Sequence, residues 1–213
     1  MNVLDNVTYG PTRQRVLSID DARTKAMDML RRCGGLHTAA ERFPAQLSSG
    51  MQRRVEIVRA LAAAKASTVA ESVAAPALVI GCDSMLEFEG LAHGKPLTPE
   101  AASDRWRRMR GKTGTLHTGH HIIRIAGGIE VASAHAVVST EVDFADISDA
   151  EVSAYVATGE PLHVAGAFTL DSKGSAFISG VRGDHANVVG LSLAGLRLLL
   201  QQVGVRWTDL WRA

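Results

Sequence analysis

From residue 76 onward, stretches rich in Val, Ile and Thr alternate with stretches whose apolar residues recur every three or four positions. A pattern of this kind requires a sheet covered by helices, because each strand face and each apolar helix stripe must be buried against another element. The sequence therefore predicts an α/β fold. Strands are expected at residues 77–81, 116–125, 129–144, 168–170 and 176–181. The continuous apolar run of the first indicates a strand buried on both faces. Gly127 and Gly128 are the expected hairpin turn between the second and third strands, and a turn at residues 171–174 is expected between the last two.

Capping residues mark the ends of the predicted helices. Thr98 precedes a proline and a glutamate, which is typical of an N-cap and a first helical turn. Ser148 and Glu151 have the spacing of a capping box, and Gly159 stands where a left-handed helix cap is expected. A final helix is predicted from about residue 192 to Val203.

Charge and composition exclude several classes of function. Lys and Arg total 23 and Asp and Glu total 22, so a net charge of +1 provides no overall field for nucleic acid or anionic lipid. No apolar run is long enough to span a membrane, and the N-terminal sequence lacks the pattern of a signal peptide. We therefore expect a cytoplasmic protein that holds any anionic ligand through a few local residues.

Candidate chemistry follows the first predicted strand. Asp83 is expected at the carboxyl end of that strand, where open α/β sheets bind ligands. Lys95 lies between a glycine and a proline about a dozen residues later. A carboxylate and an ammonium in converging loops suit a polyphosphate with bound Mg²⁺: the acid ligates the metal or orients water, and the lysine neutralises phosphate. A surface salt bridge is the alternative that these two residues leave open.

A series of short motifs extends from residue 61 to the end of the chain. They are LAAAKA at 61–66, ALVIGCDS at 77–84, GKP at 94–96, MRG at 109–111, LHTG at 116–119, YVATGEP at 155–161, AGAF at 165–168, GD at 183–184 and NVVGL at 187–191. The set, in this order, resembles the Maf family of nucleotide pyrophosphatases. The resemblance implies the Maf-like (ITPase-like) fold, a mixed twisted sheet flanked by helices.

The resemblance also implies an activity, the hydrolysis of nucleoside triphosphates to a monophosphate and pyrophosphate with Mg²⁺ or Mn²⁺. Asp83 would be the metal-linked carboxylate or the proton acceptor that positions water at the α-phosphorus. Because an ordinary aspartate, with a pKa near ~3.9, is a weak base at neutral pH, the metal must activate the water or the site must raise that pKa. The residues implied to bind the substrate are Lys65, Ser84, Lys95, Thr118 and Asp171.

Two features remain open under this resemblance. Asp171 stands where many relatives have glutamine, at a position linked to base selection, so the preferred nucleotide base is undetermined. Family members often form dimers, so a homodimer is an alternative to a monomer.

Residues 1–60 depart from the family. Maf proteins begin with a strand that leads into an S-x-S-x-R-R phosphate loop, and this chain has neither. The segment instead resembles an ABC-transporter ATPase, in NVTYGP at 6–11 and in LSSGMQRRV at 47–55, which is similar to the LSGGQ signature region. We therefore expect an ABC-ATPase-like helical fragment at 1–60 and a Maf-like domain at 61–213, with the first strand and phosphate loop replaced and catalysis weakened.

Three functions are thus compatible with the sequence. The first is a nucleoside triphosphate pyrophosphatase whose activity is impaired by the missing phosphate loop. The second is a catalytically inactive nucleotide-binding or interaction protein descended from such an enzyme. The third is a fragment of an ABC-transporter ATPase subunit, which is disfavoured because the phosphate-binding pattern G-x-x-x-x-G-K-[ST] is absent.

Overall fold

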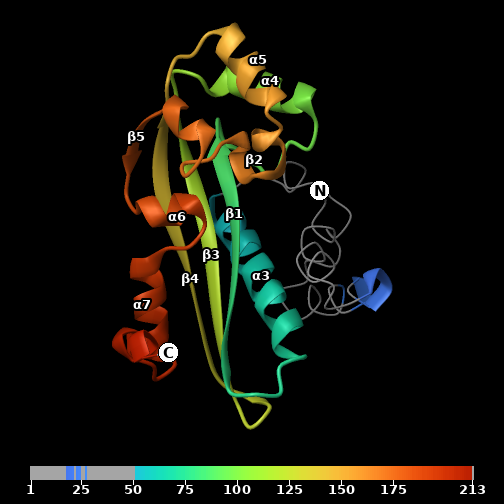
Figure 1. The fold of residues 1–213 in the computed structure, drawn as a ribbon, viewed down its shortest axis with the longest axis vertical. Helices are drawn as coiled ribbons and strands as arrows, with labels where there is room; N and C mark the ends of the chain where they lie inside the picture. The colour runs from blue at the N-terminus through green and yellow to red at the C-terminus, as the bar shows by residue number, and fades with distance from the viewer. Residues whose placement is uncertain (1–17, 22, 25–26, 28–50, 213) are drawn as a thin grey trace. The chain divides into compact units, whose positions relative to one another are not determined.

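The computed structural model describes residues 18–21, 23–24, 27 and 51–212, and it contains the predicted α/β arrangement (Figure 1). Residues 19–21, 23–24 and 27 are helical, and from residue 51 onward the α-helices are α3 (Met51–Ala70), α4 (Pro99–Met109), α5 (Asp149–Ala157), α6 (His185–Val189) and α7 (Leu193–Gln202). The strands are β1 (Ala77–Phe88), β2 (Leu91–His93), β3 (Thr113–Ala126), β4 (Ile129–Phe144) and β5 (Ile178–Arg182). Short 3₁₀ helices are η3 (Glu160–His163), η4 (Ala165–Ala167), η5 (Lys173–Phe177) and η6 (Trp207–Arg212). In this part of the chain, no helix has the length and apolar character needed to cross a bilayer.

The strands form one sheet in the order β2-β1-β3-β4-β5. β1 pairs antiparallel with β2, and β4 pairs antiparallel with β5. Strands β3 and β4 are joined at Gly127 and Gly128, as the sequence predicts. These two glycines have positive φ angles of 60° and 78°. Glycine suits this connection because it adopts positive φ without steric cost.

The described chain divides into two compact units. The first unit contains residues 84–118 and 139–192. The second contains residues 51–83, 119–138 and 193–212 among those described. Strands β1, β3 and β4 each contribute residues to both units, so each unit is described by itself below.

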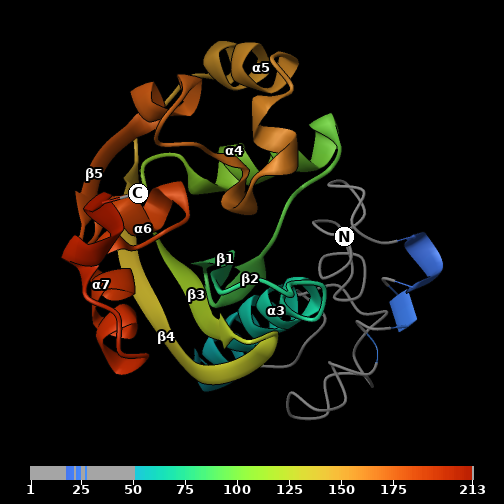
Figure 2. The ribbon, with the colours of Figure 1, turned by 60° about the horizontal axis from the view of Figure 1, so that its bottom comes forward.

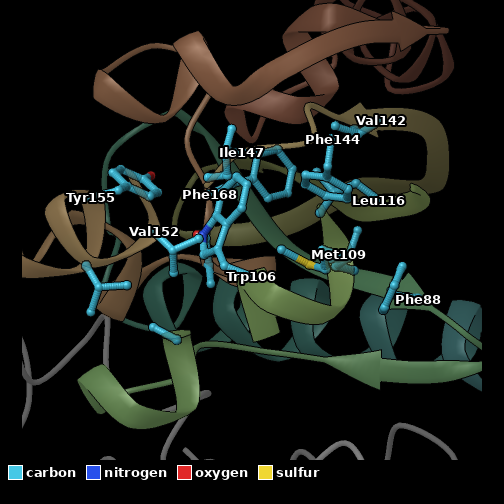
Figure 3. Packing of buried hydrophobic residues seen from close by; sticks show 14 residues of the cluster. Phe88, Trp106, Met109, Leu116, Val142, Phe144, Ile147, Val152, Tyr155 and Phe168 are labelled. Atoms are coloured by element: carbon cyan, nitrogen blue, oxygen red, sulfur yellow. The ribbon is translucent and has the colours of Figure 1, made fainter. Parts of the chain in front are cut away.

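An aromatic cluster forms the core of the first unit (Figure 3). Trp106 of α4 is fully buried, and its ring meets Phe144, Tyr155 and Phe177 edge-on at centroid distances of 5.7, 5.6 and 6.0 Å. The indole Nε1 donates a 2.7 Å hydrogen bond to the carbonyl of Ala167. The ring therefore links α4 to β4, α5 and the segments that follow α5.

Replacing Trp106 with phenylalanine should destabilise this core. The change removes the indole donor and leaves the buried Ala167 carbonyl without it, so we expect the free energy of unfolding to fall by about 2 kcal/mol. Urea unfolding measures the effect. Trp211→Phe is the matched control, because Trp211 is 73% exposed and its loss should change stability by less than about 0.5 kcal/mol. Equal effects for the two variants would contradict the assigned core role.

The predicted helix caps are present. The Thr98 side chain accepts a hydrogen bond from the Ala101 amide at the start of α4. Ser148 and Glu151 form a complete capping box at the start of α5. Gly159, just beyond α5, has a φ of 75°, the left-handed conformation that was expected there.

In the second unit, α3 lies beside β1 and β3 (Figures 1 and 2). The approach depends on two glycines: a Cβ atom at Gly81 would lie 2.2 Å from the carbonyl oxygen of Ala62, and one at Gly119 would lie 2.4 Å from that of Val58. Because the obstructing atoms are backbone, no larger residue fits without moving the helix. Buried apolar side chains on the same elements complete this core, namely Ala66, Val79, Ile123 and Ile125.

The prediction for the first strand is wrong in two respects. The strand predicted at 77–81 continues to Phe88, so Asp83 lies within β1 and not at its carboxyl end. The side chain of Ile80 is 42% exposed, so the strand is not buried on both faces. Polar residues after Gly81 fit within the strand, because alternate side chains of a strand point to opposite faces of the sheet.

The prediction of a strand at 168–170 is also wrong. The chain there has no regular structure and follows the turn η4, in which Gly166 and Ala167 have positive φ angles of 75° and 67°. Such angles interrupt an extended ladder. The last strand, predicted at 176–181, begins at Ile178, because the turn η5 occupies the preceding residues.

Candidate functional site

Asp83 and Lys65 form an ion pair within the second unit. Lys65 extends from α3, and its Nζ donates to Oδ1 of Asp83 and, at 3.4 Å, to the carbonyl of Cys82. The Asp83 side chain is 9% exposed and that of Lys65 is 24% exposed. Gly81 precedes Asp83 by two positions and so faces the same side of β1. The close approach of α3 at Gly81 therefore brings the ammonium to the carboxylate.

The other carboxylate oxygen of Asp83, Oδ2, is buried and has no hydrogen-bond partner in the described part of the chain. Buried polar atoms nearly always have a partner, so this oxygen is suited to one that comes from outside the protein. Among the described residues, no group of three or more His, Cys, Asp or Glu is placed so that it could hold a metal ion. A cation at Asp83 would therefore need phosphate or water oxygens as its further ligands, which is how proteins commonly bind Mg²⁺.

Cys82, next to this pair, does not supply a thiolate ligand. Burial raises the pKa of its thiol to about 11, although the charge of Lys65 opposes the shift. The thiol is therefore protonated at neutral pH and is not a resting nucleophile. The chemistry in this unit is that of the carboxylate and the ammonium.

A pocket of about 150 Å³ lies within the first unit. Its polar groups come from Ser84, Thr169 and Asp171. A small number of polar groups among apolar walls is typical of a ligand site. The remaining lining residues are Leu116, Val164, Ala165, Phe168, Leu170, Val188, Val189 and Gly190.

Buried hydrogen bonds set the orientation of Ser84 in this pocket. Its Oγ lies 2.9 Å from Oγ1 of Thr118, which is fully buried and donates to the carbonyl of Asn187 at 3.2 Å. Because the Thr118 hydrogen is directed to that carbonyl, the Ser84 hydroxyl donates to Thr118. Ser84 therefore offers acceptor lone pairs to a ligand, and the carboxylate of Asp171 is likewise an acceptor.

Lys95 lies in the loop after β2, also in the first unit. The carbonyl of the preceding Gly94 accepts hydrogen bonds from Arg105 at 2.5 Å and from the Gly166 amide at 3.3 Å. Burial lowers the pKa of Arg105 to about 10, so the guanidinium stays charged at neutral pH and strengthens its bond to the loop. Two contacts thus fix the backbone beside Lys95.

The predicted site residues fall into two groups. Lys65 meets Asp83 in the second unit, whereas Ser84 and Asp171 share the pocket in the first, with Thr118 behind Ser84. The roles of these residues and of Lys95 in binding or catalysis remain predictions.

Sequence reasoning missed Glu160, which lies in η3. Its Oε1 accepts hydrogen bonds from the Tyr155 hydroxyl, the Thr169 hydroxyl and the Gly174 amide, at 3.0, 2.5 and 2.9 Å. Its Oε2 accepts from the Ser172 hydroxyl at 2.9 Å and from the backbone amide of the following lysine at 3.3 Å. The GEP motif contains this glutamate, and a turn is predicted at residues 171–174, but the sequence does not reveal that the glutamate binds this turn from up to 14 residues away.

The titration of Glu160 predicts a pH-dependent contribution to stability. Burial alone would raise its pKa, but the hydrogen bonds outweigh burial and lower the pKa from its ordinary 4.5 to about 2. A carboxyl group with a lowered folded-state pKa stabilises the protein fully above its unfolded pKa and progressively less as pH falls toward the folded value. We expect the stability difference between wild type and Glu160→Gln to shrink between pH 4.5 and pH 2. Urea unfolding at several pH values measures it, and a constant difference would contradict the prediction.

Comparison with known proteins assigns the chain to a family. The sequence model described as Maf-like protein matches residues 21–203, and the chain therefore belongs to the Maf family. The nucleoside triphosphate pyrophosphatase of Streptomyces coelicolor is 49% identical over 185 residues, which cover 83% of this chain and 88% of that protein. The protein of the same name from Leifsonia xyli subsp. xyli is 54% identical, and the match covers 63% of this chain and 62% of that protein. The one from Thermosynechococcus vestitus is 51% identical, and the match covers 72% of this chain and 76% of that protein.

The predicted resemblance of residues 1–60 to ABC-transporter ATPases lies mostly outside the described residues and stays a prediction. The division at residue 60 also stays a prediction. That position lies inside α3, and the family match begins before it, at residue 21.

Proposed function

We propose that this protein hydrolyses nucleoside triphosphates to nucleoside monophosphates and pyrophosphate. The observation that carries the proposal is the buried Oδ2 of Asp83, which has no partner in the described chain while Lys65 engages the other oxygen. The names of the similar proteins from three bacteria support the same activity.

In the proposed reaction a water oxygen attacks the α-phosphorus, and the bond between that phosphorus and the α,β-bridging oxygen breaks. Pyrophosphate leaves with the bridging oxygen, and the proton of the water passes to Asp83 or to solvent. Asp83 would contact the water, or a Mg²⁺ or Mn²⁺ ion, through Oδ2. Such an ion, when bound, neutralises phosphate charge and makes water more acidic.

Lys65 has two roles in this proposal. Its ammonium holds Oδ1 of Asp83 and so fixes the direction in which Oδ2 points. The same charge also favours the binding of a polyanion and the charge that develops on the phosphate oxygens. Lys95, in its fixed loop, is proposed as a second phosphate contact.

The pocket in the first unit is proposed to bind the nucleotide base. Its volume of about 150 Å³ and its apolar walls suit a single heterocycle rather than a whole nucleotide. The acceptors of Ser84 and Asp171 would pair with N–H groups on the edge of that base, and Thr118 would act by holding Ser84. The preferred base is part of the test below.

A nucleotide-binding protein without turnover is the second candidate. It is favoured by one sequence observation, the missing S-x-S-x-R-R phosphate loop. Under either candidate function we expect the protein to be cytoplasmic and to form a homodimer. Light scattering in solution tests whether it is a dimer.

Pyrophosphate release from purified protein tests the proposed function. We would supply dTTP, UTP, CTP, GTP and ATP in turn, with Mg²⁺, with Mn²⁺ and with excess EDTA. The proposal expects equal amounts of pyrophosphate and monophosphate from at least one nucleotide, and no release in EDTA. Calorimetric nucleotide binding without release would support the second candidate, and neither binding nor release would contradict both.

A further inference from the structure

We propose that Glu160 is a positioning residue for the nucleotide: its carboxylate fixes the turn at residues 169–174, which forms one wall of the pocket. This inference rests on the proposed role of that pocket in nucleotide binding. Glu160 is not among the residues that line the pocket, so its effect on a ligand must pass through the turn.

Glu160 accepts hydrogen bonds from four polar groups of the turn, two hydroxyls and two backbone amides. Both ends of the turn are held, Thr169 by its hydroxyl and Gly174 by its amide, and Ser172 is held between them. Three lining residues of the pocket, Thr169, Leu170 and Asp171, lie within the same six residues. A single carboxylate thus sets the path of the backbone that carries one wall.

Glu160 is itself tied to the core. The Tyr155 hydroxyl donates to it, and the Tyr155 ring is buried against Trp106 at a centroid distance of 5.6 Å. The turn also packs tightly at its end, because a Cβ at Gly174 would lie 2.4 Å from the Tyr155 hydroxyl oxygen. Core, carboxylate and turn therefore form one continuous set of contacts within the first unit.

The donors around residue 160 require a negatively charged carboxylate at this position. All five groups directed at Glu160 are donors, three hydroxyls and two backbone amides. A glutamine has nearly the same shape, but its amide nitrogen would direct two hydrogens at one set of these donors. Glu160→Gln therefore disturbs the turn without leaving a cavity.

Glu151→Gln is the matched control. Glu151 also accepts hydrogen bonds at its own site, from the amide and hydroxyl of Ser148 at 2.7 Å each, but it caps α5 and contacts no pocket residue in the described hydrogen-bond network. Its loss should lower the thermal midpoint without changing nucleotide affinity. It therefore separates a loss of fold stability from a loss of positioning.

The test measures binding of the nucleoside monophosphate product by calorimetry, together with KM and kcat for the corresponding triphosphate. We expect Glu160→Gln to raise both the Kd and KM by about tenfold, the size expected when charge-assisted hydrogen bonds are lost, and to change kcat by less than about twofold. Hydrogen exchange at the amides of Lys173 and Gly174 should also become faster in Glu160→Gln and not in Glu151→Gln.

Two results overturn the inference. One is an unchanged Kd and KM in Glu160→Gln when its thermal midpoint falls as it does in Glu151→Gln. The other is a fall in kcat alone. Failure of the proposed function is distinguishable from both, because the wild-type protein itself would then release no pyrophosphate, whether or not it binds the monophosphate.

Discussion

Asp83→Asn should reduce pyrophosphate release by about a thousandfold or more, within the range that proteins lose with a general base or a metal-linked carboxylate. Asparagine keeps the shape of the side chain but removes its charge and its basicity. The neutral amide can neither accept a proton nor bind a divalent cation strongly, and the Lys65 ammonium loses its counter-ion. Initial rates of pyrophosphate release at saturating nucleotide measure the effect.

Glu141→Gln is the control for this experiment. Glu141 is also a strand carboxylate paired with a cation, Arg182, at 2.8 Å, but it is 52% exposed. Its loss should change the rate by less than about twofold, because exposed ion pairs contribute little. Circular dichroism must show that Asp83→Asn retains its fold. A folded Asp83→Asn protein with more than a tenth of wild-type activity would remove Asp83 from the catalytic role.

The second large effect is expected at Gly81. Gly81→Ala places a methyl group 2.2 Å from the Ala62 carbonyl oxygen and 2.7 Å from the Ala66 amide nitrogen, so α3 must move away from β1. We expect a loss of about 3 kcal/mol in the free energy of unfolding, at the upper end for overpacking because the obstructing atoms are backbone. Urea unfolding measures the loss. The movement of α3 also separates Lys65 from Asp83, so the folded fraction should release pyrophosphate more slowly.

Gly180→Ala provides the comparison. Its Cβ would lie 2.8 Å from the Asp143 carboxylate oxygen, which is the end of a side chain and can turn aside. We expect its cost to be below about 1 kcal/mol. Equal losses for the two variants would show that α3 does not depend on Gly81 for its position.

The parts of the fold that local chemistry dictates were predictable from the sequence. The Thr98 cap, the box at Ser148 and Glu151 and the glycine turn between β3 and β4 each need a particular residue at a particular place, and all are confirmed. A turn at residues 171–174 was predictable from its residue types, but the geometry of the short 3₁₀ helices between residues 160 and 177 was not. Their geometry depends on long-range partners such as Glu160, which leave no periodic pattern in the sequence.

In the candidate site, too, some features were predictable from the sequence and others were not. Asp83 stood out because it follows an apolar run, but its position within β1 was missed, since a polar residue in the middle of a strand resembles the end of one. Its partner Lys65 lies 18 residues earlier on a helix, and only the family resemblance indicated it. Oδ2 of Asp83, which carries the proposed function, lacks a partner among the described residues because of three-dimensional packing, a feature that the sequence does not show.

Gly81 and Gly119, which α3 contacts closely, also determine how α3 is rotated about its long axis. Val58, Ala62 and Ala66, the helix residues that approach Gly81 and Gly119, are spaced by four and occupy one stripe. Advancing the helix by one residue would rotate it by about 100° and swing the ammonium at position 65 away from the acid. The contacts that fix the rotation of α3 begin at Val58. The sequence before residue 58 can therefore be mutated or replaced during evolution while the Lys65 ammonium keeps its direction.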